Sequence, residues 1–158
     1  MRRTIPCLAA ALCATPAPAA EPQAFGQWTA YCASDAGCAL ATAAEDGHRL
    51  AFSEPAYGED RMVFLPLEPI LRGSTVTVTL DGAAGASLGP GDGWRMVEMP
   101  GGAAAQIAPS VAENELMVRM PGRTSLEIAY QGESGTPRKA RFDLDGYARA
   151  RAWVTSNQ

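Results

Sequence analysis

The sequence has 158 residues, with 13 lysines and arginines, 17 aspartates and glutamates, and a net charge of −4. An acidic chain without a basic block is poorly suited to phosphate contacts, so we expect no nucleic-acid partner. Hydrophobic residues make up 47% of the chain, which is typical of one folded domain and argues against disorder.

Residues 1–20 predict a secretory signal peptide. The segment opens with Arg2 and Arg3, continues as an apolar run and ends on the small residues around Ala17 and Ala19. The apolar run is too short to cross a bilayer, and we expect no transmembrane segment in the mature chain. The protein is therefore expected to be periplasmic or secreted, in a Gram-negative bacterium.

The mature domain, residues 21–158, retains a single pair of cysteines. Cys7 and Cys13 are lost with the signal peptide, which leaves Cys32 and Cys38. An even pair in an oxidising compartment predicts a disulfide bond. The C-x5-C spacing is not that of a thiol oxidoreductase, and one histidine is too few for a zinc site.

The first predicted elements are two strands of a hairpin, residues 27–32 and 38–42, joined by a small polar turn. Cys32 is expected opposite Cys38, so that the disulfide fixes the register of the hairpin. Four side chains are expected on the same face as the disulfide: Trp28, Ala30, Leu40 and Thr42.

Apolar and polar side chains alternate with a period of two in segments bounded by glycine or proline, and this pattern predicts further strands along the chain. They are expected at residues 49–53, 60–65, 74–80, 94–99, 115–120, 125–131 and 138–144. Residues 82–93 are rich in glycine and predict a flexible loop. A short helix is expected at 147–154, capped by Asp145. The fold class is therefore all-β, a single antiparallel sandwich-like or partly closed barrel domain with a short C-terminal helix.

Candidate catalytic and metal-binding residues do not form a coherent set. His48, the one histidine, is expected to be solvated in an exposed hairpin loop, which leaves a Ser-His-Asp triad without its base. Asp143 and Asp145 share a strand face and are open to a catalytic or calcium-binding role, but solvated side chains are the favoured interpretation. We therefore expect no catalytic residues and no enzyme activity.

The Met-x-x-Met spacings, at 96–99 and 117–120, place methionines three residues apart. On a strand these point to opposite faces and cannot converge on copper, so we expect no metal site and no cofactor. Among the tryptophans, Trp94 is the one expected to be exposed after the glycine-rich loop. It is the candidate contact for a ligand or partner.

A series of short motifs spans the mature chain. They are Phe25-Gly26-Gln27-Trp28, the cysteine pair, the segment 65–73 (LPLEPILRG), a strand ending in Asp81-Gly82, and the segment 142–150 (FDLDGYARA). This order resembles the invasion-associated locus B family of proteobacterial secreted proteins. Members usually carry a second cysteine pair, and its absence here, near residues 98–104, marks a divergent member.

The resemblance implies a periplasmic or surface-associated β-protein, linked in some members to host-cell invasion, and it supplies no catalytic residues. Together with the export signal, it predicts a non-enzymatic envelope protein that acts through protein–protein contact with an unknown envelope partner. The predicted role is in host-cell invasion or envelope integrity. The alternative is a periplasmic small-molecule or glycan-binding protein that uses Trp94. A carboxylate-based hydrolase ranks last.

Overall fold

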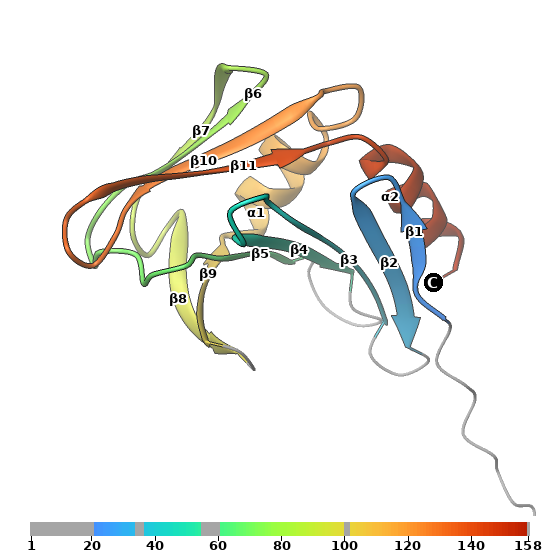
Figure 1. Ribbon diagram of the computed structural model, residues 1–158, viewed down its shortest axis with the longest axis horizontal. Helices are drawn as coiled ribbons and strands as arrows, with labels where there is room; N and C mark the ends of the chain where they lie inside the picture. The colour runs from blue at the N-terminus through green and yellow to red at the C-terminus, as the bar shows by residue number, and fades with distance from the viewer. Residues whose placement is uncertain (1–20, 34–36, 55–60, 100–101, 158) are drawn as a thin grey trace, which may run out of the picture.

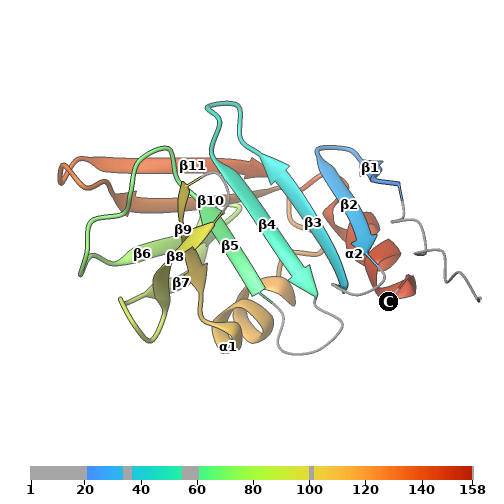
Figure 2. The ribbon, with the colours of Figure 1, turned by 90° about the horizontal axis from the view of Figure 1, so that it is seen from below.

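The computed structural model describes residues 21–33, 37–54, 61–99 and 102–157 (Figure 1). The predicted signal peptide, residues 1–20, lies outside the described residues. The described strands form two antiparallel sheets that face each other, with a helix at one end (Figures 1 and 2). The predicted fold class is confirmed, and of the two architectures left open the sandwich-like one is found. The sheets do not close into a barrel within the described part of the chain.

The large sheet has seven strands, and the small sheet has four. In spatial order the large sheet consists of β1 (Gln23–Phe25), β2 (Trp28–Ala33), β3 (Gly37–Ala43), β4 (Arg49–Glu54), β5 (Arg61–Leu65), β9 (Gly102–Ile107) and β8 (Trp94–Met99). The small sheet consists of β11 (Pro137–Asp143), β10 (Ser125–Gln131), β6 (Val76–Leu80) and β7 (Ala83–Leu88).

Side chains alternate across both sheets, and the apolar set from each sheet fills the space between them. On β10, Leu126, Ile128 and Tyr130 are buried while the residues between them face outward. The first hairpin has the predicted register, with Ala30 opposite Leu40. Because successive residues of a strand point to opposite faces, each strand presents one row to the core and one row away from it.

Helices complete the core at two places. Helix α2 (Tyr147–Ser156) packs on the first strands of the large sheet, where the ring of Tyr147 meets Trp28 edge-on at 5.1 Å between centroids. The short α1 (Pro109–Val111) continues into η1 (Ala112–Met117), a helix with wider, π-type turns. In the described residues, no helix has the length and hydropathy that a membrane crossing requires.

Three predicted elements are wrong. The expected loop at 82–93 contains strand β7, and the expected strand at 115–120 overlaps η1. The buried residues Ala112, Leu116, Met117 and Met120 have helical spacing, whereas Val118, which a strand would bury with Leu116, is 61% exposed. Among the described residues, no side chain caps the N-terminus of α2, so the predicted Asp145 cap is absent; the helix begins after Gly146 in the left-handed conformation.

Candidate functional site

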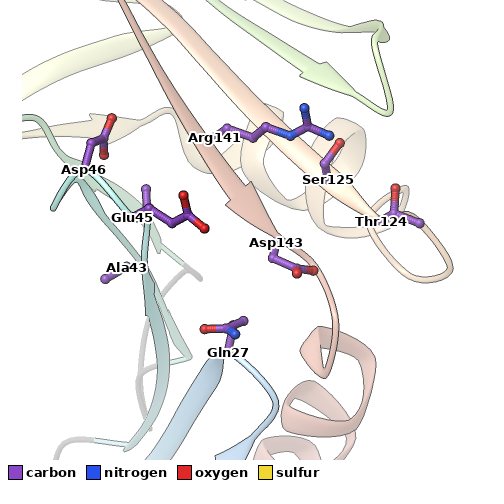
Figure 3. A pocket seen from close by; sticks show the side chains of 9 residues that line it. Gln27, Ala43, Glu45, Asp46, Thr124, Ser125, Arg141 and Asp143 are labelled. Atoms are coloured by element: carbon purple, nitrogen blue, oxygen red, sulfur yellow. The ribbon is translucent and has the colours of Figure 1, made fainter.

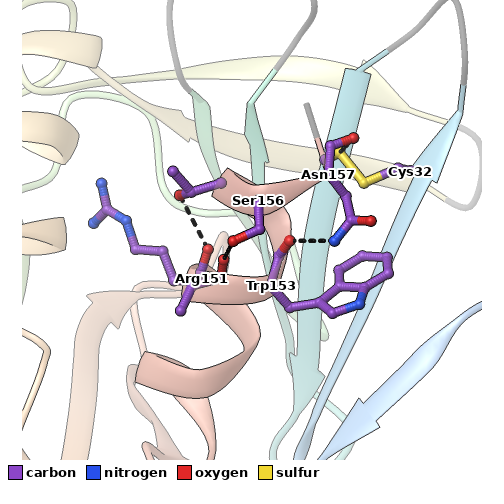
Figure 4. The surroundings of a disulfide bond; sticks show 8 residues. Cys32, Arg151, Trp153, Ser156 and Asn157 are labelled. Carbon is purple, nitrogen blue, oxygen red and sulfur yellow. Dashed lines mark hydrogen bonds between the residues drawn. A yellow bond between two sulfur atoms is a disulfide. The ribbon is translucent and has the colours of Figure 1, made fainter.

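The predicted disulfide is confirmed. Cys32 and Cys38 face each other across β2 and β3 and are bonded to each other. The end of α2 lies beside the bond, where the backbone oxygen of Asn157 is 3.8 Å from Sγ of Cys38 (Figure 4). A disulfide sulfur carries no proton, so this is a packing contact and not a hydrogen bond. The disulfide therefore links β2 to β3 at the end of the hairpin that lies beside the end of the C-terminal helix.

His48 occupies a buried position, and the prediction of a solvated loop histidine is wrong. Only 3% of its surface is exposed, although it lies in the turn between β3 and β4. The imidazole stacks on Phe64, with the two ring planes at 8°. Nδ1 lies 2.7 Å from Oδ1 of Asp46, and Nε2 lies 2.8 Å from the hydroxyl of Tyr130. Asp46, His48 and Tyr130 form one chain of hydrogen bonds, which we call the Asp-His-Tyr chain.

The proton positions in the Asp-His-Tyr chain follow from the groups at its two ends. The hydrogen bond with His48 is the main cause that lowers the pKa of Asp46, so this group is an ionised acceptor. Burial raises the pKa of Tyr130, which remains a hydroxyl donor. A neutral imidazole with its proton on Nδ1 donates to Asp46 and accepts from the hydroxyl of Tyr130 at Nε2. Both ring nitrogens are engaged within the protein.

A polar cavity of about 610 Å³ opens beside Asp46 (Figure 3). The turn between β3 and β4 faces β11 across this cavity, and Glu45 turns its carboxylate into it. The lining residues are Gln27, Ala43, Ala44, Glu45, Asp46, Thr124, Ser125, Arg141 and Asp143.

Asp46, at the edge of this cavity, is unsuited to act as a general acid. A general acid that works near neutral pH needs a raised carboxyl pKa, whereas the pKa of Asp46 is lowered.

The predicted carboxylate pair does not converge on this cavity. Asp143 lines it, but Asp145 does not. Oδ1 of Asp143 instead accepts a hydrogen bond from the backbone N–H of Asp145 at 2.8 Å, which stabilises the turn before α2. Both carboxylates lie at the surface, as expected for solvated side chains.

Trp94 is buried, so its predicted exposure is wrong. It is 3% exposed, and its indole N–H donates to the backbone oxygen of Ser74 at 3.1 Å. The residue lines a second cavity of about 340 Å³, which we call the arginine pocket. The lining residues of the arginine pocket are Arg61, Gly91, Trp94, Arg95, Gln106, Ile107, Ala108 and Pro109.

The outward side of the large sheet, named here the alanine face, carries a cluster of alanines on β3 and β4 among valines and polar side chains. Figure 2 looks onto this side, where no drawn helix crosses in front of β3, β4 or β5. The alanine face consists of Thr29, Tyr31, Ala39, Ala41, Ala43, Arg49, Ala51, Ser53, Arg61, Val63, Leu65, Arg95, Val97, Ala104 and Gln106. Ala39, Ala41 and Ala51 are half-buried by their neighbours in the sheet.

The outward side of the small sheet has a different composition. Thr77 and Thr79 point outward from β6, and Glu127 pairs with Lys139 across β10 and β11 at 2.8 Å. Ala129 is the apolar member of this polar row. The two sheets therefore differ on their solvent sides even though both bury the same kind of side chain between them.

Sequence reasoning missed the partners of His48 and the composition of the arginine pocket. Tyr130 lies 82 positions from His48, and the pocket combines residues of β5, β8 and β9. No local spacing marks either group, because both depend on how the strands pair and how the sheets stack.

Comparison with solved structures finds the same fold in invasion associated protein B from Bartonella henselae. The match has a TM-score of 0.67 and 15% sequence identity, and it covers 88% of this chain and 99% of that chain. At this identity the likeness establishes a shared fold. No protein-family model matches the sequence, and no curated protein sequence matches it. The disulfide and the shared fold are compatible with a location outside the cytoplasm.

Proposed function

We propose that this protein is an exported, non-enzymatic envelope protein that binds a protein partner through the alanine face. The observation that carries the proposal is the composition of that face, where Ala39, Ala41 and Ala51 lie side by side on β3 and β4 without a described element over them. Contiguous apolar surface on a soluble protein is where contacts with other proteins are commonly made. A row of small side chains gives a surface that another protein can approach closely.

Charge identifies the kind of partner. The whole chain has a net charge of −4, yet the charged residues of the alanine face are all arginines: Arg49, Arg61 and Arg95. Opposite charges across an interface guide association and disfavour incorrect partners. The occupant is therefore a protein that presents acidic side chains around an apolar centre.

The other outward surface makes a useful contrast. The small sheet presents threonines and the Glu127–Lys139 ion pair, as an ordinary solvated sheet face does. Ala51 and Ala129 are both half-buried, outward-pointing alanines, one in each sheet. They supply a matched pair of positions for testing which face is used.

The cellular location in this proposal follows from the amino-terminal segment. Cleavage after residues 1–20 releases a mature domain into the periplasm or the medium, where the bond between Cys32 and Cys38 forms. The motif resemblance and the fold shared with invasion associated protein B support membership of the invasion-associated locus B family. They also support a role in host-cell invasion or envelope integrity.

The non-enzymatic part of the proposal is supported by the Asp-His-Tyr chain. A histidine that acts as a general base must reach a substrate proton with a free ring nitrogen. In His48, Nδ1 faces Asp46 and Nε2 faces Tyr130, and the ring is buried. This geometry suits a structural role in the core.

The experiment places a photo-crosslinking amino acid at position 51 or at position 129 in the exporting cell. A discrete adduct from position 51, absent from position 129, supports the proposal, and mass spectrometry identifies the partner. Equal adducts from both positions, or an adduct from position 129 alone, would overturn it. Mass spectrometry of the exported protein checks the location, with an expected first residue of Ala20 or Glu21.

A small-ligand-binding protein is the second candidate function. The observation in its favour is the arginine pocket, which is concave and has Trp94 in its wall. Binding sites for small molecules usually combine such a cavity with a few polar groups that fix orientation. The hydrolase remains last, because Asp143 and Asp145, its candidate carboxylates, both lie exposed at the surface.

A further inference from the structure

The arginine pocket brings three polar side chains together on neighbouring strands. Gln106 of β9 is paired with Val63 of β5 on one side and with Arg95 of β8 on the other. Arg61 is two residues before Val63, so it points to the same side of the sheet. Strand register alone therefore places Arg61, Gln106 and Arg95 on one face, and all three line the pocket.

Gln106 is the buried polar group of this pocket, with 8% of its surface exposed. Its side-chain oxygen accepts hydrogen bonds from Nε and Nη2 of Arg95, at 3.3 and 3.1 Å. Its amide N–H groups have no acceptor among the residues that the structure describes. A buried donor without a partner is costly, so an acceptor supplied from outside the chain would bind favourably there.

The pocket also has uncompensated positive charge. Arg61 makes no ion pair within the described ranges of the chain, and Arg95 is hydrogen-bonded to a neutral amide. Among the described residues, no aspartate or glutamate lines the cavity. Two guanidinium groups therefore face a small cavity with no described carboxylate between them. Trp94 also lines the pocket, and its indole N–H is bonded to the backbone oxygen of Ser74, away from any ligand.

We propose that the arginine pocket binds a phosphate group, with Arg61 and Arg95 as the charged donors and Gln106 as the neutral donor. A phosphate monoester carries nearly two negative charges at neutral pH and has three terminal oxygens. A phosphate group therefore matches two arginine charges and a third donor better than a monocarboxylate does. Arginine commonly binds phosphate through two parallel hydrogen bonds. The cavity of about 340 Å³ accommodates the group and a small attached body.

This inference goes beyond the proposed function, because it concerns a small ligand, and Arg61 and Arg95 belong both to the arginine pocket and to the alanine face. The ligand is either free phosphate or the phosphate of a small ester. Both present the same chemistry to the pocket, and the experiment distinguishes them. Crosslinking at position 51 tests the protein partner separately, since Ala51 does not line the arginine pocket.

The experiment is an NMR titration of the ¹⁵N-labelled exported protein at constant ionic strength. The probes are inorganic phosphate and glycerol phosphate, with succinate as the comparison dianion. Saturable shifts of the Arg61 and Arg95 Nε–H signals and of the Gln106 amide signals are expected with phosphate. Tighter binding of glycerol phosphate would identify an ester as the ligand, and equal or weaker binding would identify free phosphate. The proposal is overturned if neither phosphate probe shifts these signals, or if succinate binds as tightly.

Variants assign the binding to the pocket. Arg61→Gln should weaken phosphate binding about tenfold or more, since it removes a charge-assisted contact. Arg95→Lys keeps the charge but loses the planar fork, and it should also weaken binding. Arg141→Gln is the matched control, because Arg141 is an exposed arginine at the other cavity. Its binding should stay within roughly twofold of the parent. Equal weakening in Arg141→Gln, or unchanged binding in both pocket variants, would overturn the proposal.

Discussion

The hydroxyl of Tyr130 lies 2.8 Å from Nε2 of His48, and this hydrogen bond joins the two sheets through the core. His48 belongs to the turn between β3 and β4 of the large sheet, whereas Tyr130 belongs to β10 of the small sheet. The bond therefore fixes how the two sheets stack at this end of the sandwich.

Replacing Tyr130 by phenylalanine should lower the free energy of unfolding by about 1–3 kcal/mol, because Nε2 of His48 loses its hydrogen-bond partner in a buried position. Urea denaturation measures the change. Tyr31→Phe is the control, since Tyr31 is 46% exposed and the loss of its hydroxyl should cost less than about 0.5 kcal/mol. Equal stability of Tyr130→Phe and the parent would contradict the role of this bond.

Acid should destabilise the protein partly through Asp46. Its pKa is held below the ordinary value of 3.8, mainly by the hydrogen bond with His48. A carboxyl whose pKa is depressed by folding contributes stability that is fully present above its unfolded value. That contribution is lost as the pH falls through the folded value. Asp46→Asn retains an oxygen acceptor but does not titrate, so its stability should decline less steeply than that of the parent below about pH 4. Parallel declines in a series of denaturation curves would refute this assignment.

Gly146 should tolerate no side chain. It has a φ of +86°, and an added Cβ would overlap the carbonyl group of Phe25, where the end of β1 meets the start of α2. Gly122 has a similar φ of +80° but open space around it. Gly122→Ala should therefore show the backbone cost alone, about 1 kcal/mol, and Gly146→Ala a loss of about 3 kcal/mol or more. Equal unfolding temperatures for the two variants would show that the start of α2 does not pack against Phe25 as described.

The disulfide should contribute modestly to stability and more to local order. The bond joins residues six positions apart, and closing so short a loop is worth roughly 2 kcal/mol in the chain-entropy description. The double variant Cys32→Ala, Cys38→Ala should lose about that amount in urea denaturation. Peptide mapping of the exported parent should find the two cysteines linked, and free thiols at both positions would contradict the hairpin.

Strands with strong contrast between their two faces could be predicted from the sequence. In β6, valines and leucine alternate with threonines, and in β11 Phe142 alternates with charged neighbours. Strands β7 and β9 were not predicted, because AAGASL and GAAAQI lack this contrast. Alanine and glycine fit either face, so the neighbouring strands decide their structure.

The site was partly predictable for the same reason. The disulfide depends on two cysteines that are close in sequence, and the sequence predicted it. The burial of His48 depends on Phe64 and Tyr130, which come from different strands, and the sequence placed this histidine in solvent. Trp94 was expected to be exposed because the preceding segment looked like a loop. Instead, its indole N–H donates to the backbone oxygen of Ser74, and the residue lines the arginine pocket.

The central claim is that the alanine face contacts the partner. Ala51→Glu places a charge in the middle of that face, and Ala129→Glu places the same charge on the outward side of the small sheet. The direct measurement is the affinity of each folded variant for the partner captured at position 51. Ala51→Glu should weaken binding at least about tenfold through burial of an unpaired charge, and Ala129→Glu should bind like the parent. Unchanged binding by Ala51→Glu, or equal losses in both variants, would contradict the account.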